Sequence, residues 1–510
     1  MKDTFYITTP IYYVNDYPHI GHAYTTVAAD VLARYHRQRG KKVHFLTGTD
    51  EHGQKIEKAA QKKGESPIEL ADRVVGRFEG LWEALNISHN DFIRTSQDRH
   101  KQGALDFFQR CLDQGDIYEG EYEGWYSVND EEFLTETHIA ELGKDIENDP
   151  NIVRLKESTY FFRLSKYQDQ LLQHIESHPH FIAPESRKNE VISFIKQGLK
   201  DLSISRTSFS WGIPLPNNSK HVLYVWFDAL SNYITALDFH NQGKLYQEFW
   251  PANVHLVGKD ILRFHAIFWP IFLMSAGLPL PEQIFAHGWW TVEGQKMSKS
   301  KGNFVDPFAF VDQYGRDAFR YFLLREFSFG QDGNFAQENF VARLNADLAN
   351  ELGNLVSRSL SMLEKYRDGK IPPQPSSSEL SEWIAEQAQK YQQCIEEKKF
   401  DQAFANIWKI FARANQYIEQ KQPWSLAKDP ASSTALDQVL YELMEVIRMG
   451  SALIYPIMPD LSTAIRDKLS LTPIECTVGK DFLTQELNWG LSVSGSPTKK
   501  GSSLFMRIES

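Results

Sequence analysis

The spacing of apolar residues changes twice within the first fifty positions. Residues 5–9 have the composition of a strand, which Pro10 ends. Apolar side chains then recur every three or four residues over 20–38, which predicts a helix with Gly40 as its C-terminal cap. Residues 43–46 form a second apolar run. This order of strand, helix and strand is typical of a doubly wound α/β fold.

The pattern that follows predicts an interrupted sheet. Residues 67–85 and 100–114 carry helical spacing suited to helices packed on the sheet. A stretch from residue 119 reads as an inserted subdomain of short strands, and helices are expected over 166–177 and 188–200. Strand character returns at 222–225 and 254–257, each time before a helical run, so we expect the sheet to resume there.

Beyond residue 335 the chain reads as helical. Leucines and other apolar residues over 340–363 keep roughly a 3.6-residue period, a Pro- and Ser-rich linker covers 372–378, and amphipathic runs occupy 382–397, 401–420 and 433–455. The predicted fold is therefore a Rossmann-like, doubly wound parallel sheet with a connective insertion, followed by an all-α bundle and a short tail. The expected units are 1–115, 116–221, 222–335 and 336–510.

Charge modifies this picture. The 510 residues carry 55 Lys and Arg against 66 Asp and Glu, a formal charge of −11, which argues against a general polyanion binder. Residues 119–149, however, hold eleven acidic residues and one basic residue, Lys144, so this stretch alone accounts for −10. Residues 390–428 hold seven basic and four acidic residues, a net +3. The acidity is therefore local to the insertion.

Cysteine content and apolar runs indicate the setting of the protein. Three cysteines cannot build a disulfide framework or a four-thiolate zinc site. The N-terminus lacks the features of a signal or transit peptide. The longest apolar stretch, 266–276, contains Pro270 and is far shorter than the roughly 20 residues that span a bilayer. A cytoplasmic location without a membrane segment is expected.

Two short motifs carry the candidate chemistry. His19-Ile20-Gly21-His22 follows the first strand and opens the first helix, where backbone N–H groups attract anions. Taken alone, its histidines are equally compatible with metal ligands or surface residues. Lys296-Met297-Ser298-Lys299-Ser300 is a loop whose two lysines suit a phosphate chain, although an isolated lysine cluster is more often a solvated loop.

Together the motifs resemble the HIGH and KMSKS signatures of class I aminoacyl-tRNA synthetases, in the same order and on the same elements. The 273 residues between His22 and Lys296 are too few for the large editing domain of the leucyl, isoleucyl and valyl enzymes. Further detail, from Phe5 to about Trp424, resembles the methionyl-tRNA synthetases. The resemblance implies ATP-dependent ligation of L-methionine to tRNA through methionyl-adenylate, with release of pyrophosphate and AMP.

The resemblance also implies a methionine site. A thioether favours adaptable apolar and aromatic walls, and an aspartate can hold the substrate ammonium. Taken singly, the two tryptophans are more often core residues. The implied methionine-binding residues are Ile11, Tyr13, Asp50, Trp226, Ala229, Tyr233, Ile261, His265 and Trp269.

ATP, as its Mg²⁺ complex, is the second implied substrate. Asp50 and Glu51 follow the second strand, and this acidic pair is also suited to direct Mg²⁺ binding, an alternative ranked below ammonium recognition. The implied catalytic residues are His19, His22, Lys296 and Lys299. The implied ATP contacts are these four with Gly21, Arg206, Gly258, Lys259 and Asp260.

A third implied site reads the anticodon of methionine-accepting tRNA, elongator and initiator alike. Asn350, Asn354 and Arg358 are four residues apart on one helical face, and Trp424 follows Pro423. Amides and a guanidinium can hydrogen-bond splayed bases, and an indole can stack on one. Without the resemblance, such a stripe is usually a solvated helix face. We expect the acidic insertion to face away from the tRNA.

One feature departs from many members of that family. Where a Cys-x-x-Cys zinc knuckle is expected in the insertion, this chain has Ser127 and Asp130, and no cysteine lies between Cys111 and Cys394. The sequence therefore predicts no structural zinc. No additional dimerisation domain is evident, which favours a monomer. Two rival functions are an amino-acid or nucleotidyl ligase that uses no tRNA, and a catalytically silent tRNA-binding protein.

Overall fold

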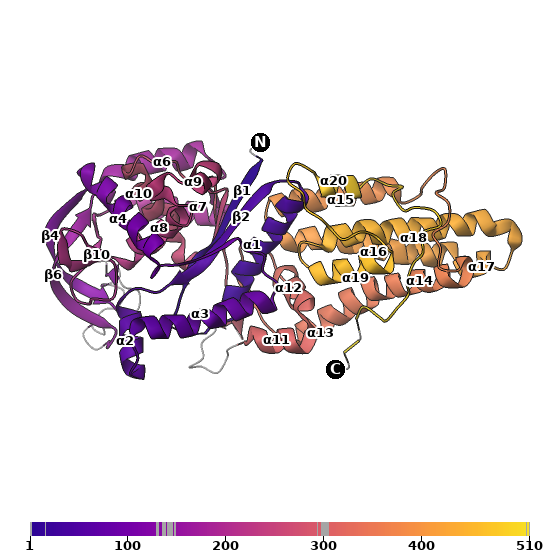
Figure 1. The fold of residues 1–510 in the computed structure, drawn as a ribbon, viewed down its shortest axis with the longest axis horizontal. Coiled ribbons are helices and arrows are strands. Elements are labelled where there is room, and N and C mark those ends of the chain that lie inside the picture. Colours follow the sequence, from indigo (N-terminus) through magenta and orange to yellow (C-terminus); the bar gives the residue numbers. More distant parts are fainter. Residues whose placement is uncertain are drawn as a thin grey trace.

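The computed structural model describes residues 3–15, 17–128, 132–134, 139, 146, 149–292, 294–296, 305–505 and 507–508. It has an α/β lobe and an elongated helical lobe, with α1 (Ile20–Gln38) running between them (Figure 1). The α/β and all-α parts follow each other in the chain as the sequence predicts.

The α/β lobe is built on a six-stranded sheet whose paired neighbours are all parallel. The strand order is β3-β2-β1-β12-β13-β7, with β1 at Thr4–Tyr13, β2 at Lys42–Asp50, β3 at Asp91–Arg94, β12 at Val254–Gly258, β13 at Ile284–His287 and β7 at Ile182–Ala183. From β1, successive strands of the chain are added toward β3 on one side and, from β12 on, toward β13 on the other side, so the order of strand addition reverses between β1 and β12. In open parallel sheets, ligands bind at such a reversal, beside the carboxyl ends of the strands.

Helices cover this sheet close to the predicted bounds. Helix α1 matches the predicted range of 20–38, while α3 (Pro67–Ala84) and α4 (Asp98–Asp113) end one residue before the predicted limits. Helix α8 (Val225–Thr235) is buried throughout, and α10 (Trp269–Ser275) extends a short π-helix, η5 (Phe264–Phe268). Across the described ranges, no helix is both long and apolar enough to cross a bilayer.

The insertion contains two antiparallel sheets. One has the order β5-β4-β6-β8, with β4 at Ile117–Ser127, β5 at Glu132–Phe133, β6 at Ile152–Phe162 and β8 at Leu202–Ser203. The other has the order β10-β11-β9, with β10 at Pro214–Leu215, β11 at Asn218–Leu223 and β9 at Ser205–Arg206. Helices α6 (Gln168–Ser177) and α7 (Glu185–Lys196) correspond to the two predicted helices.

The prediction that 222–225 re-enters the main sheet is wrong. Residues 222–223 belong to β11, which pairs antiparallel with β9, and Val225 already begins α8. The apolar run looked like a core strand because its last residues are buried against the insertion. The main sheet resumes at β12, and β7, within the predicted insertion, adds an edge strand beside β13.

Asp116 ties the insertion to the core of the α/β lobe. Its carboxylate accepts hydrogen bonds from Lys166 Nζ at 2.6 Å, Tyr167 OH at 2.5 Å and Ser275 Oγ at 2.8 Å. The residue is fully buried, so each of these bonds compensates part of the cost of removing the carboxylate from water.

A small sheet and two helices connect the lobes. The hairpin of β14 (Trp290–Val292) and β15 (Gln295–Lys296) pairs with β16 (Gly333–Asn334), and α11 (Pro307–Tyr314) and α12 (Arg316–Arg325) follow. Arg320 of α12 is fully buried between the lobes. Its guanidinium donates to Asp30 Oδ2 on α1 at 2.7 Å, and to the carbonyl oxygens of Leu85, Pro456 and Ile457.

The helical lobe starts with one long, uneven helix. Helix α13 (Gln337–Arg343) passes into a π-helix, η7 (Leu344–Gly353), and then into α14 (Asn354–Arg367). The helix predicted over 340–363 from a roughly 3.6-residue period is present, but its middle part, η7, is a π-helix in which Leu344, Leu348 and Leu352 are buried. The bundle is completed by α15 (Ser381–Glu396), α16 (Phe400–Lys421), α17 (Pro423–Leu426), α18 (Ser433–Ile454), α19 (Pro459–Lys468) and α20 (Phe482–Glu486).

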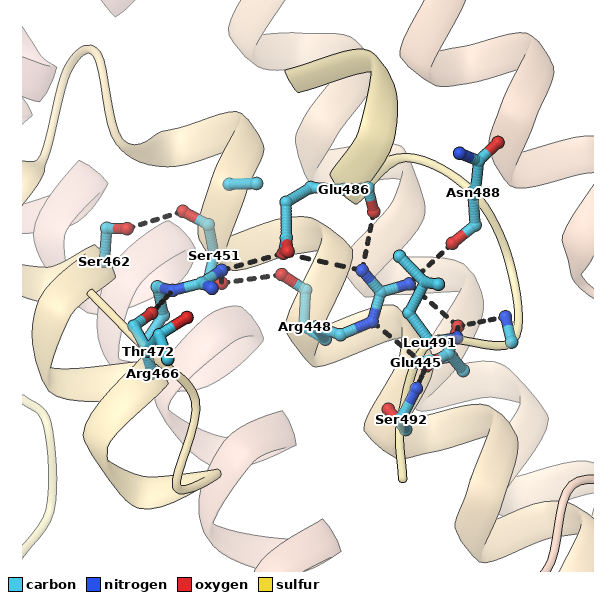
Figure 2. A network of polar contacts seen from close by, with 12 residues as sticks. Glu445, Arg448, Ser451, Ser462, Arg466, Thr472, Glu486, Asn488, Leu491 and Ser492 are labelled. Carbon is cyan, nitrogen blue, oxygen red and sulfur yellow. Dashed lines mark hydrogen bonds and ion pairs between the residues drawn. The ribbon is translucent and has the colours of Figure 1, made fainter. Parts of the chain in front are cut away.

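The segment after α19 folds back along the bundle. Arg448 of α18 is buried and donates to Glu445 and to the carbonyl oxygens of Glu486 and Asn488, while Arg466 pairs with Glu486 at 2.9 Å (Figure 2). The same segment reaches the α/β lobe, where Asp481 pairs with Arg39 at 2.9 Å. The final residues are therefore packed against the bundle: Lys468 Nζ donates to Ser502 O at 2.7 Å.

Candidate active site

A cavity of about 610 Å³ opens at the carboxyl edge of the parallel sheet, beside the reversal between β1 and β12. It is bounded by the end of β1, the first turns of α1, the end of β2, helix α8 and the residues that follow β12 and β13. Its lining includes Ile11, Tyr13, His19, Gly21, His22, Asp50, Trp226, Ala229, Tyr233, Gly258, Asp260, Ile261 and His265. The structure therefore brings most of the predicted methionine and ATP residues into one cavity.

The two histidines cap the first turn of α1. The backbone N–H of His19 donates to His22 Nδ1 at 3.0 Å, and the backbone N–H of Gly21 donates to His19 Nδ1 at 3.0 Å. Because each Nδ1 accepts, each neutral ring carries its proton on Nε2. Both rings line the cavity and therefore bring N–H donors to the positive end of the helix.

Gly21 is required by this arrangement. A Cβ at this position would stand 2.8 Å from His19 Cε1 and 3.0 Å from His19 Nδ1. The first of these contacts is closer than real Cβ atoms tolerate, so a side chain here would displace the His19 ring from its capping position. The glycine thus keeps the ring over the helix end.

Helix α8 forms an aromatic wall. The ring of Trp226 stacks on Phe264 with centroids 3.7 Å apart and planes inclined by 4°. Tyr233 OH lies 2.7 Å from His265 Nε2. His265 Nδ1 donates to Ile261 O at 2.9 Å, and burial lowers the pKa of His265 to about 4, so Nε2 of the neutral ring accepts the tyrosine proton.

Trp269 lies behind this wall and does not line the cavity. It is fully buried, its ring centroid is 5.9 Å from that of Tyr233, and its indole N–H donates to His255 Nε2 at 3.2 Å. In this structure, Trp269 packs behind Tyr233 and supports the pocket from there. This position agrees with the alternative that the tryptophan is a core residue.

The loop after β2 separates its two carboxylates. Asp50 lines the cavity. Glu51 points the other way: Oε1 accepts from Arg94 Nε at 2.7 Å and from Thr49 Oγ1 at 2.7 Å, and Oε2 accepts from Ser96 Oγ. With its oxygens occupied by an arginine and two hydroxyls, Glu51 does not form an acidic pair with Asp50 toward the cavity. This geometry disfavours direct Mg²⁺ binding by the pair.

Gly258 and Asp260 reach the cavity from the end of β12, whereas Lys259 turns outward. Lys259 Nζ is 2.6 Å from Asp332 Oδ2 and lies over the Trp289 ring at 4.2 Å. The Trp289 indole N–H donates to Asp260 Oδ1 at 3.1 Å. Lys259 is therefore not a lining residue of the cavity, and its ammonium contacts Trp289, the residue that donates to Asp260.

Several cavity residues were not predicted from the sequence, among them Thr25, Asn232, His287 and Trp289. Thr25 Oγ1 lies 2.7 Å from His287 Nε2, joining α1 to the end of β13. Two signals identify this pair: Thr25 is one helical turn after Gly21, and His287 stands at a strand's carboxyl end.

Arg206 is not brought into the cavity. It is 1% exposed on β9, where Nη1 donates to Ser203 Oγ at 2.8 Å and Ser205 O at 2.8 Å, and its guanidinium lies over the Tyr224 ring at 4.6 Å. In this structure, the guanidinium serves the junction of the insertion's two sheets. The predicted contact with ATP phosphates stays a prediction.

The two lysines of the predicted phosphate loop are not placed. The backbone of Lys296 ends β15, but its side chain and all of residues 297–304, Lys299 among them, lie outside the described residues. What the structure does give is the base of the loop: Thr291 of β14 is paired with Lys296.

The predicted anticodon residues lie in the helical lobe. Asn350 of η7 and Asn354 of α14 are exposed, and Arg358 donates to Glu419 near the end of α16 at 2.6 Å. Trp424 of α17 is 37% exposed, and α17 lies at the end of the lobe remote from the sheet (Figure 1). Arg358 and Trp424 thus flank the same helix end.

The possible zinc position in the insertion is only half described. Ser127 ends β4, whereas Asp130 lies outside the described residues. Among the residues that are placed, no cluster of three or more His, Cys, Asp or Glu side chains is suited to a metal ion.

We predict that the purified protein holds no stoichiometric zinc. Elemental analysis is expected to find well below one zinc per chain, and a chelator is expected to leave the melting temperature unchanged, because a structural zinc site would otherwise contribute directly to folding. One zinc per chain that survives dialysis would contradict this prediction.

Comparison with known proteins identifies the family. A family model described as class I tRNA synthetases (M) matches residues 5–147 and 144–360, and one described as the anticodon-binding domain of methionyl tRNA ligase matches residues 370–508. The chain belongs to the methionyl-tRNA synthetase family. The methionine–tRNA ligase of Caldanaerobacter subterraneus is 50% identical over all of this chain and 80% of its own length. That of Bacillus subtilis is 47% identical over all of this chain and 78% of its length.

Solved methionyl-tRNA synthetases have the same fold. The Mycobacterium tuberculosis enzyme in complex with methionyl-adenylate superposes with a TM-score of 0.93 at 43% identity, covering 99% of this chain and all of that one. Its apo form gives a TM-score of 0.86 at 40% identity, covering all of this chain and 99% of that one. The expected resemblance to methionyl-tRNA synthetases and the predicted α/β plus helical fold are confirmed.

Proposed function

We propose that the cavity beside the β1/β12 reversal carries both steps of methionine–tRNA ligation, with ATP as its Mg²⁺ complex. The overall activity follows from family membership: this chain is a methionine–tRNA ligase of class I. The observation that carries the assignment to this cavity is the convergence of Asp50, the aromatic wall of α8 and the two histidine donors around one space.

In the first step, a carboxylate oxygen of methionine attacks the α-phosphorus of ATP in line. The bond from that phosphorus to the bridging oxygen breaks, and pyrophosphate leaves, which gives methionyl-adenylate. No enzyme nucleophile is needed, so catalysis is mainly positioning and stabilisation of phosphorane charge. The Nε2–H groups of His19 and His22 are suited to phosphate oxygens, and Lys296 and Lys299 are proposed to approach them from the loop after β15.

In the second step, a terminal ribose hydroxyl of the tRNA attacks the adenylate carbonyl. The ester bond to the ribose forms, the bond to phosphate breaks, and AMP leaves. The hydroxyl proton is transferred to a phosphate or solvent oxygen. The same donors that stabilise phosphorane charge then face the departing AMP phosphate.

Methionine recognition divides between two sides of the cavity. Asp50 is proposed to bind the ammonium group through a charge-assisted hydrogen bond. Ile11, Tyr13, Ala229, Ile261 and the stacked Trp226 surround the side chain, where each sulfur–aromatic contact adds about 0.3–1.5 kcal/mol. Tyr233 and His265 form the polar end of this subsite, and Trp269 acts from behind Tyr233.

ATP is proposed to lie along the first turn of α1 and the end of β12. Gly21 leaves room for the nucleotide beside the His19 ring, and Gly258 admits the base. Asp260 is placed to accept from ribose hydroxyls, with Trp289 and Lys259 holding it. Arg206 is buried in the insertion here. Its proposed contact with ATP therefore requires the insertion to move.

The single most informative experiment on function is amino-acid-dependent ATP–pyrophosphate exchange across the twenty amino acids. We expect exchange with methionine alone among them. Charging assays with and without tRNA then separate a tRNA synthetase from a ligase that uses no tRNA, and absence of exchange would favour a silent tRNA-binding protein.

Replacing Trp424 with alanine is expected to weaken tRNA charging without affecting activation. Loss of one base-stacking platform costs about 1–3 kcal/mol, so kcat/KM for tRNA is expected to fall by about 5- to 150-fold. Pyrophosphate exchange should stay unchanged, and Trp424→Tyr should retain most of the charging activity. We propose that Asn350, Asn354, Arg358 and Trp424 form the surface that binds the anticodon. Equal losses in pyrophosphate exchange and in tRNA charging would contradict that role.

Several further properties complete the proposal. The unit boundaries predicted at 115/116 and 335/336 are kept, whereas the one predicted at 221/222 moves to the end of β11 at Leu223. The enzyme acts as a monomer, and it charges elongator and initiator tRNA. Residues 390–428, with their net charge of +3, lie toward the tRNA, while the acidic stretch 119–149 lies away from it. Protection of residues 119–149 from proteolysis by bound tRNA would contradict that orientation.

A further inference from the structure

A connected set of buried polar groups lies directly behind the cavity. Asp228 stands on α8 between Trp226 and Ala229. His52 Nδ1 is 2.7 Å from Asp228 Oδ2, and His100 Nε2 is 2.6 Å from Asp228 Oδ1. Asp228 and His100 are fully buried, and the His52 side chain is 3% exposed.

This set joins three separate elements. His52 belongs to the loop after β2, two residues beyond Asp50, while His100 belongs to the first turn of α4. Asp228 contacts both from α8. The Asp50 side of the cavity and its aromatic side are therefore held to each other through one carboxylate.

The carboxylate is ionised, which fixes the direction of both hydrogen bonds. Burial alone would raise the pKa of Asp228, but His52 and His100 outweigh burial and lower it to about 2. An ionised carboxylate only accepts, so His52 Nδ1 and His100 Nε2 both donate to it. Burying a charge is costly unless it is paired in this way.

Helix packing brings His100 within reach. Gly103 lies three residues after His100 on the same face of α4, and a Cβ there would stand 2.6 Å from Thr235 Cγ2 on α8. Glycine thus permits a close approach of α4 to α8. The approach also brings His100 Nδ1 to 2.8 Å from Thr235 Oγ1. His100 therefore contacts α8 at two residues, Asp228 through Nε2 and Thr235 through Nδ1.

We propose that His52, Asp228 and His100 form a clamp that sets the width of the methionine subsite. They are positioning residues: they hold Asp50 at a fixed distance from Trp226 and Tyr233, so that an amino acid of one length reaches both sides. The clamp rests on the proposed roles of Asp50 and the α8 wall. A misplacement of about 1 Å caused by a residue remote from the reacting atoms can cost about 100-fold.

Variants of the clamp are compared in pyrophosphate exchange. Asp228→Asn and His100→Leu are expected to raise KM for methionine at least about tenfold, to leave KM for ATP unchanged, and to lower kcat less than about threefold. Discrimination against norleucine should fall as well. His100→Gln keeps an amide N–H near the position of Nε2 and is expected to recover most of the methionine affinity.

Asp116→Asn is the matched control, because Asp116 is also a fully buried carboxylate with three side-chain partners but lies outside the cavity lining. It should lower the melting temperature and leave both KM values unchanged. The clamp is refuted if His100→Leu behaves like this control, or if KM for methionine and ATP rise together. If Asp228→Asn does not fold, the pair His100→Leu and His100→Gln decides the question. Wild-type exchange without methionine dependence would instead refute the proposed function.

Discussion

His22→Asn is expected to lower kcat for methionine-dependent pyrophosphate exchange by about 100- to 1,000-fold. The asparagine amide oxygen can replace His22 Nδ1 as acceptor of the His19 backbone N–H, while the Nε2–H donor is lost. Losing one donor to a developing oxyanion costs about 2.7–4 kcal/mol. Because His22 is not proposed to bind methionine, KM for methionine should change by less than about twofold.

His22→Ala separates the two uses of this ring. It removes the capping acceptor as well, so it should lose activity like His22→Asn and in addition lose about 0.5–2 kcal/mol of stability. Thermal unfolding followed by circular dichroism measures that difference. Full exchange activity in His22→Asn would contradict the proposed role of Nε2–H in stabilising phosphorane charge.

Asp30→Ala is expected to produce the largest loss of stability, about 3–5 kcal/mol. Arg34 Nε and Arg320 Nη2 both donate to Asp30 Oδ2 at 2.7 Å, and all three residues are buried. Burial opposes ionisation, yet Arg34 and Arg320 hold the pKa of Asp30 well below its usual value. Removing the carboxylate leaves two buried guanidinium groups without their counter-charge.

Asp460→Ala is the matched control for this interface. Asp460 pairs with Arg316 at 2.5 Å between the helical lobe and α12, but both side chains are partly exposed to solvent, 36% for Arg316 and 48% for Asp460. An exposed pair contributes about 0–1 kcal/mol, so the melting temperature should barely change. Equal effects of the two substitutions would show that the burial of Asp30 has no energetic consequence.

Three of the six strands of the parallel sheet, β1, β2 and β12, could be predicted because their local signals are strong, although β1 runs past Pro10 to Tyr13. The helix over 20–38 combines apolar spacing, a capping motif and Gly40, and it was placed correctly. The apolar run at 222–225 was wrongly predicted as a strand of the main sheet. A segment buried against the insertion and a strand buried in the main sheet have the same apolar composition. Only the pairing of β11 with β9 distinguishes them, and that pairing depends on long-range packing.

The candidate site shows a similar division. The residues at strand ends and in the first turn of α1 were predicted through the family resemblance, and their position at one edge of the sheet agrees with where such folds bind ligands. His52, Asp228 and His100 were not, since their relation spans 176 and 128 positions in sequence. Arg206 shows the converse: a motif match suggested a contact with ATP, whereas the guanidinium here lies in a buried sheet junction.

The return of the C-terminal segment to α1 bears on how the chain folds during synthesis. Gln38 Nε2 donates to Ala452 O, and Arg39 Nε donates to Asp481, contacts that span 414 and 442 residues. A ribosome therefore exposes the end of α1 long before its partners exist. Until then, that end has polar groups without native partners, so the α/β lobe reaches its final stability only after most of the helical lobe has been translated.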